Sequence, residues 1–261
     1  MSAGVGAGQA VGRTGAGQAT GSAGAGETVG LDDLSLTLAD GARVLFTSRA
    51  DGNLSTLRGV DPEHGRARRE ALCSRLGLDW LCASRQVHGT DVQLLRTNTA
   101  RGGEPLAIDA DGHATALSGV GAMVLTADCL PVALAGGRAG EGGGVVAMVH
   151  AGWRGLAAGV LEQGVRALRE LGADGELEAA IGPGAGVCCY EVGADVHRAF
   201  GGAHRDGDAI DLRAIARERL HAAGVAQVRD VRACTICDER FFSHRRDGER
   251  AGRQAGVAWL S

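Results

Sequence analysis

Short apolar runs alternate with polar turns along the chain, and from about residue 30 the pattern predicts both strands and helices. Residues 34–38 and 42–48 indicate two strands joined at Asp40-Gly41, a dipeptide typical of tight hairpins. Residues 144–150 form a continuous apolar run, as expected of a strand that is buried on both faces. Shorter apolar runs predict further strands at 81–87, 91–95, 122–126, 177–182 and 228–233.

Helical periodicity is clearest in three segments. Residues 61–76 predict a helix that ends near Gly77. After residue 150, apolar side chains recur at helical spacing up to a stop at Gly172, at Leu156, Val160, Val165, Leu168 and Leu171. Asp211 is placed to cap a third helix that Gly224 closes. The order of elements predicts an α/β fold, with mixed α+β as an alternative: one domain of mixed sheets flanked by helices.

Residues 1–28 differ from the rest because they consist almost wholly of Gly, Ala, Ser, Thr and Gln. Such a segment has too few apolar side chains to offset its conformational entropy. We therefore expect a disordered tail at 1–28 and one catalytic domain at 29–261. With 261 residues, 44% of them apolar, the chain is long enough for a sizeable core.

Charge and cysteine content narrow the class of protein. The net charge is −4 and the chain contains no lysine, so no basic face for nucleic acid is expected. No apolar run approaches the roughly 18 residues that a membrane span needs, and no secretory pattern opens the chain. The seven cysteines are unevenly spaced, as thiols or metal ligands are, and we expect a cytoplasmic protein.

Three separate segments each end in a side chain that can bind a metal: His88 in RQVHGTDV, Cys129 in LTADCLPV and His150 in VVAMVHAGWRG. Single ligands from the ends of different strands are typical of a catalytic metal site. Two imidazoles and one thiolate suit Zn²⁺ and leave one coordination position open. The alternative, which spacing alone does not exclude, is that these are two ordinary histidines and a small buried cysteine.

The segment AGWRGLAAGV places Arg154 and free backbone amides where a buried strand runs into a helix. This combination predicts a site for a phosphate or carboxylate. An ion pair between Arg154 and a nearby aspartate is the alternative. IGPGAGVCCYEVG can line a pocket, but it does not match a phosphate-binding P-loop.

Two further motifs allow more than one interpretation. The C-x-x-C of Cys234 and Cys237 can be a redox pair, or it can form a four-thiolate zinc site with Cys188 and Cys189. Cys234 can also be a plain residue of a pocket wall. His244 is a candidate fourth ligand or acid–base group, with a surface or supporting histidine as the alternative.

Five ordered motifs carry a resemblance to a known family: QVHGTDV, TADCLPV, HAGWRGLAAGV, IGPGAGVCCYEVG and CTICDERFFSHRRDG. The chain resembles the bacterial purine nucleoside phosphorylases long described as multicopper polyphenol oxidases, or laccase-domain proteins. FTSRADGNLS also resembles the family's opening motif, although residues 50–53 replace its glycine turn. The resemblance spans residues 42–260.

The resemblance implies that His88, Cys129 and His150 are the metal-binding and catalytic residues of a zinc enzyme acting on purine nucleosides and phosphate. It implies phosphorolysis of adenosine, inosine and methylthioadenosine, with adenosine deamination beside it. We also expect Arg49, Asp128 and Arg154 to shape the substrate site. Family alternatives are a copper-dependent polyphenol oxidase (laccase) and a factor that edits peptidoglycan precursors. Copper is the less favoured metal, because a multicopper site needs several further histidines and the chain has eight without an H-x-H pair.

Overall fold

The computed structural model describes residues 1, 34–56, 62–98, 106–138, 140 and 142–261. The predicted tail at 1–28 lies, apart from Met1, outside the described residues. No helix in these ranges is long and apolar enough to cross a membrane.

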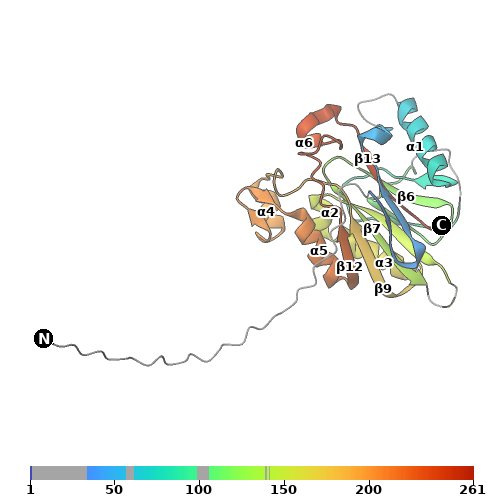
Figure 1. The fold of residues 1–261 in the computed structure, drawn as a ribbon. Coiled ribbons are helices and arrows are strands. Elements are labelled where there is room, and N and C mark those ends of the chain that lie inside the picture. Colours follow the sequence, from blue (N-terminus) through green and yellow to red (C-terminus); the bar gives the residue numbers. More distant parts are fainter. Residues whose placement is uncertain (2–33, 57–61, 99–105, 139, 141) are drawn as a thin grey trace.

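Two sheets form the centre of the fold (Figure 1). The five-stranded sheet has the order β1 (Ser35–Thr37), β2 (Arg43–Phe46), β13 (Gln254–Trp259), β6 (Val120–Thr126) and β3 (Trp80–Cys82). The six-stranded sheet has the order β12 (Val225–Asp230), β9 (Ala173–Ile181), β7 (Leu130–Arg138), β8 (Gly144–Ala151), β5 (Gly112–Thr115) and β4 (Val92–Leu95). Both sheets are mixed, because β3–β6, β4–β5 and β9–β12 are parallel pairs and the other pairs are antiparallel.

The remaining elements are helices and one small hairpin. The helices are α1 (Pro62–Leu76), α2 (Trp153–Ala158), α3 (Val160–Glu170), α4 (Ala194–Ala199), α5 (Leu212–Ala222) and α6 (His244–Asp247). The hairpin pairs β10 (Arg205–Asp206) with β11 (Ala209–Ile210). Single 3₁₀ turns lie at Ala39–Gly41, Arg49–Asp51 and Gly248–Arg250.

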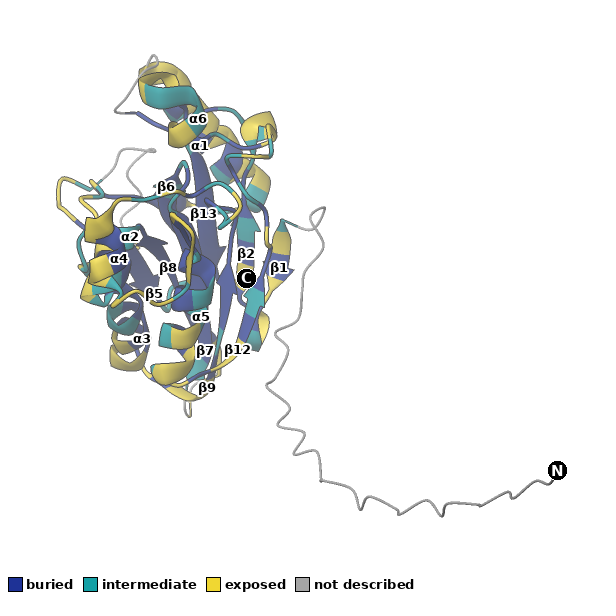
Figure 2. Cartoon of the chain, turned by 90° about the vertical axis from the view of Figure 1, so that its left-hand side faces the viewer, coloured by how far each residue is buried: buried dark blue, intermediate teal, exposed yellow. Residues whose placement is uncertain are grey.

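The sheets pack face to face and helices cover their outer faces, so the fold has four layers. Met148 of β8 belongs to the core between the sheets, and its neighbour Val149 belongs to the core beneath α3 and α5. On the other sheet Met123 packs with Leu72 of α1. Figure 2 shows the result, with buried strands between helices whose outward faces are exposed. The apolar run at 144–150 is thus explained by burial on both faces, and the mixed α/β prediction is confirmed.

The hairpin and the first helix form where the sequence predicts them. Asp40 and Gly41 both have positive φ, which the tight turn requires and which explains the Asp-Gly dipeptide. The helix predicted after residue 150 is instead divided into α2 and α3 by Gly159, whose φ is +99°. A strand predicted at 228–233 ends at Asp230, because the chain turns there and Arg232 has a positive φ.

Strand β7 is central to the fold, and the sequence pattern did not predict it. Pro131 and the Gly136-Gly137 pair read as strand breakers. In the structure Gly136 is needed, since a Cβ there would lie 2.4 Å from the side chain of Leu177. The close approach of two strands, which no local pattern reveals, determines this glycine.

Candidate metal site and cavity

Several strands end at the same end of the sandwich, and the metal-capable side chains lie there. The register pairs Leu130 with Ala151, Val132 with Ile181 and Ile181 with Asp230. The start of β7 and the ends of β8, β9 and β12 therefore meet. The end of β6 joins them through the turn at 127–129. Loops that are distant in sequence thus gather at one edge.

His88, Cys129 and His150 come together at this edge. Their candidate ligand atoms all lie within 4.8 Å of one another. Sγ of Cys129 lies 3.8 Å from Nε2 of His88, and the two imidazole rings are 4.8 Å apart between centroids. The three residues predicted from separate motifs therefore form one group that is compatible with a metal ion.

The backbone around two of these residues adopts an uncommon conformation. His88 has φ +60°, and Asp128, directly before Cys129, has φ +92°. Positive φ in residues other than glycine costs free energy and is concentrated at functional sites. Gly152 supplies the remaining space, because a Cβ there would lie 2.7 Å from Cδ2 of His88 and 3.0 Å from Sγ of Cys129.

Asp111 completes the group, and sequence reasoning missed it. Its buried carboxylate accepts a hydrogen bond from Nδ1 of His150 at 2.7 Å. It also accepts the backbone amides of Val87, His88 and Gly89 at 2.7–3.1 Å. A carboxylate on one ring nitrogen orients a histidine and leaves Nε2 available to a metal. Nothing local in IDADGH distinguishes Asp111 from Asp109.

The charges of this group favour metal binding. Burial by itself would raise the pKa of Cys129, but the charges and hydrogen bonds of His150 and His88 outweigh burial and lower that pKa to about 6. Burial likewise opposes a charge on His150, yet Cys129 and Asp111 raise its pKa to about 9. For Asp111, hydrogen bonds from His150 and backbone amides outweigh burial and lower the pKa. Because the thiolate is the form of cysteine that binds metals, this donor set fits a zinc ion.

A cavity of about 750 Å³ opens beside the three residues. Four arginines contribute to its lining: Arg85, Arg154, Arg245 and Arg253. Val87 and Leu125 add apolar surface, and the side chain of Val87 is 48% exposed. The volume lies in the range of small-molecule sites, and the arginines suit an anionic group.

The three predicted substrate residues lie in different surroundings. Arg154 lines the cavity with its guanidinium 4.3 Å from the ring centroid of Trp153, and within the described ranges it forms no salt bridge. Asp128 also lines the cavity, but both of its carboxylate oxygens accept bonds at 2.7 Å, from Thr235 Oγ1 and from the Arg245 amide. Arg49 is not among the lining residues: it donates to the Phe241 carbonyl and pairs with Asp247.

His244 and Tyr190, from the later motifs, also line the cavity. His244 bonds through Nδ1 to the Gly248 carbonyl at 3.1 Å and is not part of the metal-capable group. The guanidinium of Arg245 lies 4.7 Å from the Tyr190 ring centroid, and this contact connects the two motifs. Both motifs therefore contribute to the cavity wall.

Fold and site together define a single-domain mixed α/β protein with a candidate His–Cys–His metal site beside an arginine-lined cavity. Residues 44–261 match the family model described as multi-copper polyphenol oxidoreductase laccase, and the chain belongs to this family. Curated relatives are named purine nucleoside phosphorylase. One from Xylella fastidiosa (strain Temecula1) is 42% identical over 86% of this chain and 90% of its own. One from Escherichia coli is 38% identical, over 80% and 86%.

Solved structures show the same fold. Protein NMB0706 of Neisseria meningitidis superposes with a TM-score of 0.72 at 34% identity, covering 87% of this chain and 99% of its own. YlmD of Geobacillus stearothermophilus gives 0.70 at 30% identity, over 84% and 91%. Both likenesses extend over most of the domain.

Proposed function

We propose that the chain is a zinc-dependent purine nucleoside phosphorylase acting on adenosine, inosine or methylthioadenosine, with adenosine deamination as a second activity. The observation that carries the proposal is the position of His88, Cys129 and His150 on the wall of a cavity of nucleoside size. The names of the relatives give the reaction class. The free thiols of the described cysteines agree with the cytoplasmic location expected from the sequence.

In phosphorolysis a phosphate oxygen forms a bond to the ribose C1′ while the bond from C1′ to the purine nitrogen breaks. The purine leaves with the electron pair of that bond. Arg154 is placed to hold the phosphate, because its guanidinium lines the cavity and forms no salt bridge with a described residue. Val87 and Leu125 offer the apolar surface that a purine ring would cover.

His88, Cys129 and His150 would hold the zinc ion, and Asp111 would orient His150. When bound, zinc would supply Lewis-acid chemistry at the cavity wall. Asp128 keeps the neighbouring wall in place by tying Thr235 and the Arg245 amide to the turn that carries Cys129.

The donor sets favour zinc over copper. Within the described ranges two groups of side chains are arranged to hold a metal, and the second consists of four cysteines without a histidine. A multicopper oxidase needs several histidines around further copper ions. The oxidase therefore remains an alternative that the experiment below can distinguish.

The test is to incubate the zinc-loaded protein with adenosine, with and without inorganic phosphate, and to separate the products. We expect adenine and ribose 1-phosphate only when phosphate is present. Inosine and ammonia without phosphate would identify the deaminase, and oxygen uptake with phenols by a copper-loaded protein would identify the oxidase. Unchanged nucleosides throughout would refute the proposal, and altered muropeptides in a deletion strain would then favour the editing role.

Cys129→Ala tests the site itself. We expect activity to fall by about 100-fold or more, since even supporting residues of metal sites have effects of about 10–100-fold. Cys73→Ala is the matched control, because the Cys73 thiol only donates to the Leu78 carbonyl and lies outside the cavity lining. Full activity in Cys129→Ala would contradict the assignment.

A further inference from the structure

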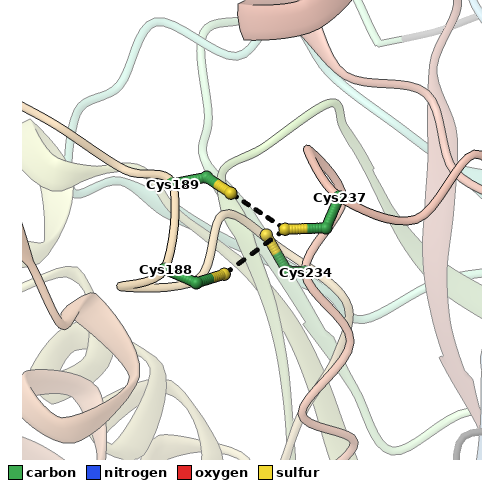
Figure 3. Close-up of side chains that lie close together, drawn as sticks. All are labelled: Cys188, Cys189, Cys234 and Cys237. Atoms are coloured by element: carbon green, nitrogen blue, oxygen red, sulfur yellow. Dashed lines mark hydrogen bonds between the residues drawn. The ribbon is translucent and has the colours of Figure 1, made fainter.

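Four cysteines form a second group away from His88, Cys129 and His150 (Figure 3). The sulfur atoms of Cys188, Cys189, Cys234 and Cys237 all lie within 4.8 Å of one another. Sγ of Cys237 is 2.8 Å from Sγ of Cys189 and 3.4 Å from Sγ of Cys188. We propose that these four cysteines bind a second zinc ion through four thiolates, as a structural site.

Neighbouring parallel strands bring the two pairs together. Cys188 and Cys189 lie in the loop after β9, and Cys234 and Cys237 lie in the segment after β12. Because β9 and β12 are parallel neighbours, both loops leave the same edge of the sheet. The Gly184 amide donates to the Ala233 carbonyl and the Thr235 amide to the Gly184 carbonyl, both at 3.1 Å. The two loops are therefore held in register up to the sulfur atoms.

Gly186 leaves the space in which the sulfurs gather. A Cβ at this position would lie 3.1 Å from Cβ of Cys234 and 3.3 Å from Sγ of both Cys188 and Cys234. The Gly186 amide also donates to Sγ of Cys234 at 3.3 Å. An N–H bond to sulfur favours the thiolate, and such bonds are the usual second layer around ligands of a metal site.

The distances agree better with one metal than with two disulfides. Zinc–sulfur bonds of about 2.3 Å in a tetrahedron place sulfurs about 3.8 Å apart. The observed range of 2.8 Å to at most 4.8 Å brackets that value. A disulfide needs about 2.05 Å. Cys237 lies near both Cys188 and Cys189 and can bond to only one, whereas a single ion can bind all four.

The donor set also selects the metal. Four thiolates without a carboxylate or carbonyl ligand exclude the hard cations Mg²⁺ and Ca²⁺ and favour zinc. Four protein ligands leave no open position, which is the mark of a structural site rather than a catalytic one. Cys188 and Cys237 are exposed, so a metal can reach the group from solvent.

The site would hold the cavity wall together. Tyr190, which follows Cys189 directly, lines the cavity. Thr235, which follows Cys234, donates to Asp128 beside Cys129. A zinc ion at the four cysteines would thus fix two loops that reach the cavity from behind. This inference does not depend on the reaction that takes place in the cavity.

The experiment counts zinc in the intact purified protein by elemental analysis. We expect two zinc ions per chain in the wild type and one in Cys188→Ser or Cys234→Ser/Cys237→Ser. Cys129→Ser should retain the zinc at the four cysteines and lose the other, and Cys73→Ser should retain both. A Co²⁺-substituted Cys129→Ser protein should show the intense thiolate-to-cobalt charge transfer of a four-sulfur site, and Cys188→Ser should show a weaker band.

Alkylation of the wild type gives a readout without any variant. Zinc should protect all four cysteines from iodoacetamide, and a chelator should expose them, as mass spectrometry of the peptides would show. Equal alkylation with and without zinc would overturn the proposal. So would a disulfide within the group in freshly purified protein, or a zinc count that stays the same in folded Cys188→Ser. None of these readouts depends on nucleoside turnover.

Discussion

The carboxylate of Asp111 accepts a hydrogen bond from Nδ1 of His150 at 2.7 Å and also accepts the backbone amides of the turn that carries His88. One buried side chain thus orients one candidate ligand and fixes the position of another. Residues with this role affect metal affinity although they do not touch the metal.

Asp111→Asn should therefore lower zinc affinity by about 10–100-fold. Asparagine has one acceptor oxygen in place of two, so buried amides also lose a partner, at a cost of about 1–3 kcal/mol in the free energy of unfolding. Competition with a chromogenic chelator measures the affinity. Asp91→Asn, a change at an exposed carboxylate, is the control. Wild-type affinity in Asp111→Asn would contradict the orienting role.

Gly152→Ala should reduce zinc binding for a steric reason. The φ and ψ of −68° and 159° suit any residue, so the backbone itself is not strained. The new Cβ would press on His88 and Cys129. Zinc content after gel filtration checks the effect. Gly89→Ala is the matched control, since its Cβ would meet neighbours at an ordinary 3.5 Å. Full zinc content in Gly152→Ala would mean that the ligands move aside without loss.

Arg154→Ala should raise KM for phosphate by about 10–100-fold, the value of one or more hydrogen bonds to a charged group. Zinc content should not change, and Arg154→Lys should restore part of the affinity. Steady-state kinetics with varied phosphate checks this. Arg49→Ala should leave that KM unchanged, because Arg49 is bound to Phe241 and Asp247 outside the cavity lining. A raised KM in Arg49→Ala would instead support the expectation from the sequence.

Asp128→Asn should destabilise the cavity wall while leaving the turn intact, because asparagine tolerates the positive φ of +92°. One of the two donors, Thr235 Oγ1 or the Arg245 amide, loses its acceptor, at about 1–3 kcal/mol. Urea denaturation measures the loss. In a double-mutant cycle with Thr235→Val, the two effects should not add. Strict additivity would show that the Thr235 bond carries no energy.

His113 should make stability depend on pH. Burial lowers the pKa of this histidine to about 4, from 6.5 when exposed. Between these values the unfolded chain binds a proton that the folded chain does not. Its contribution is therefore complete above pH 6.5 and is lost as the pH falls toward 4, by up to about 3 kcal/mol.

Urea denaturation at pH 7.5 and at pH 5 measures this loss. His113→Gln should flatten the pH dependence even though it lowers stability at pH 7.5, where the bond to Ser84 Oγ is altered. His64→Gln, at an exposed helix position, should leave the dependence unchanged. An equally steep dependence in His113→Gln would exclude His113 as its source.

Local chemistry was enough to predict several parts of the fold. Asp40-Gly41 predicted the hairpin because both residues must adopt positive φ. The run at 144–150 predicted a strand buried on both faces, which β8 is. By contrast, β7 was missed because Pro131 and Gly136 break the local pattern, while packing against Leu177 requires the glycine.

The sequence by itself determined the residue types of the site: His88, Cys129 and His150 stand at the ends of apolar runs, where side chains of the right chemistry are visible in the order of the chain. Only the tertiary structure decided which residues meet. It joined Asp111 to His150, gathered four cysteines from two loops, and placed Arg154 in the cavity lining but not Arg49. The physical reason is that these contacts depend on strand order and register, which are set by the packing of whole sheets and not by neighbours in sequence.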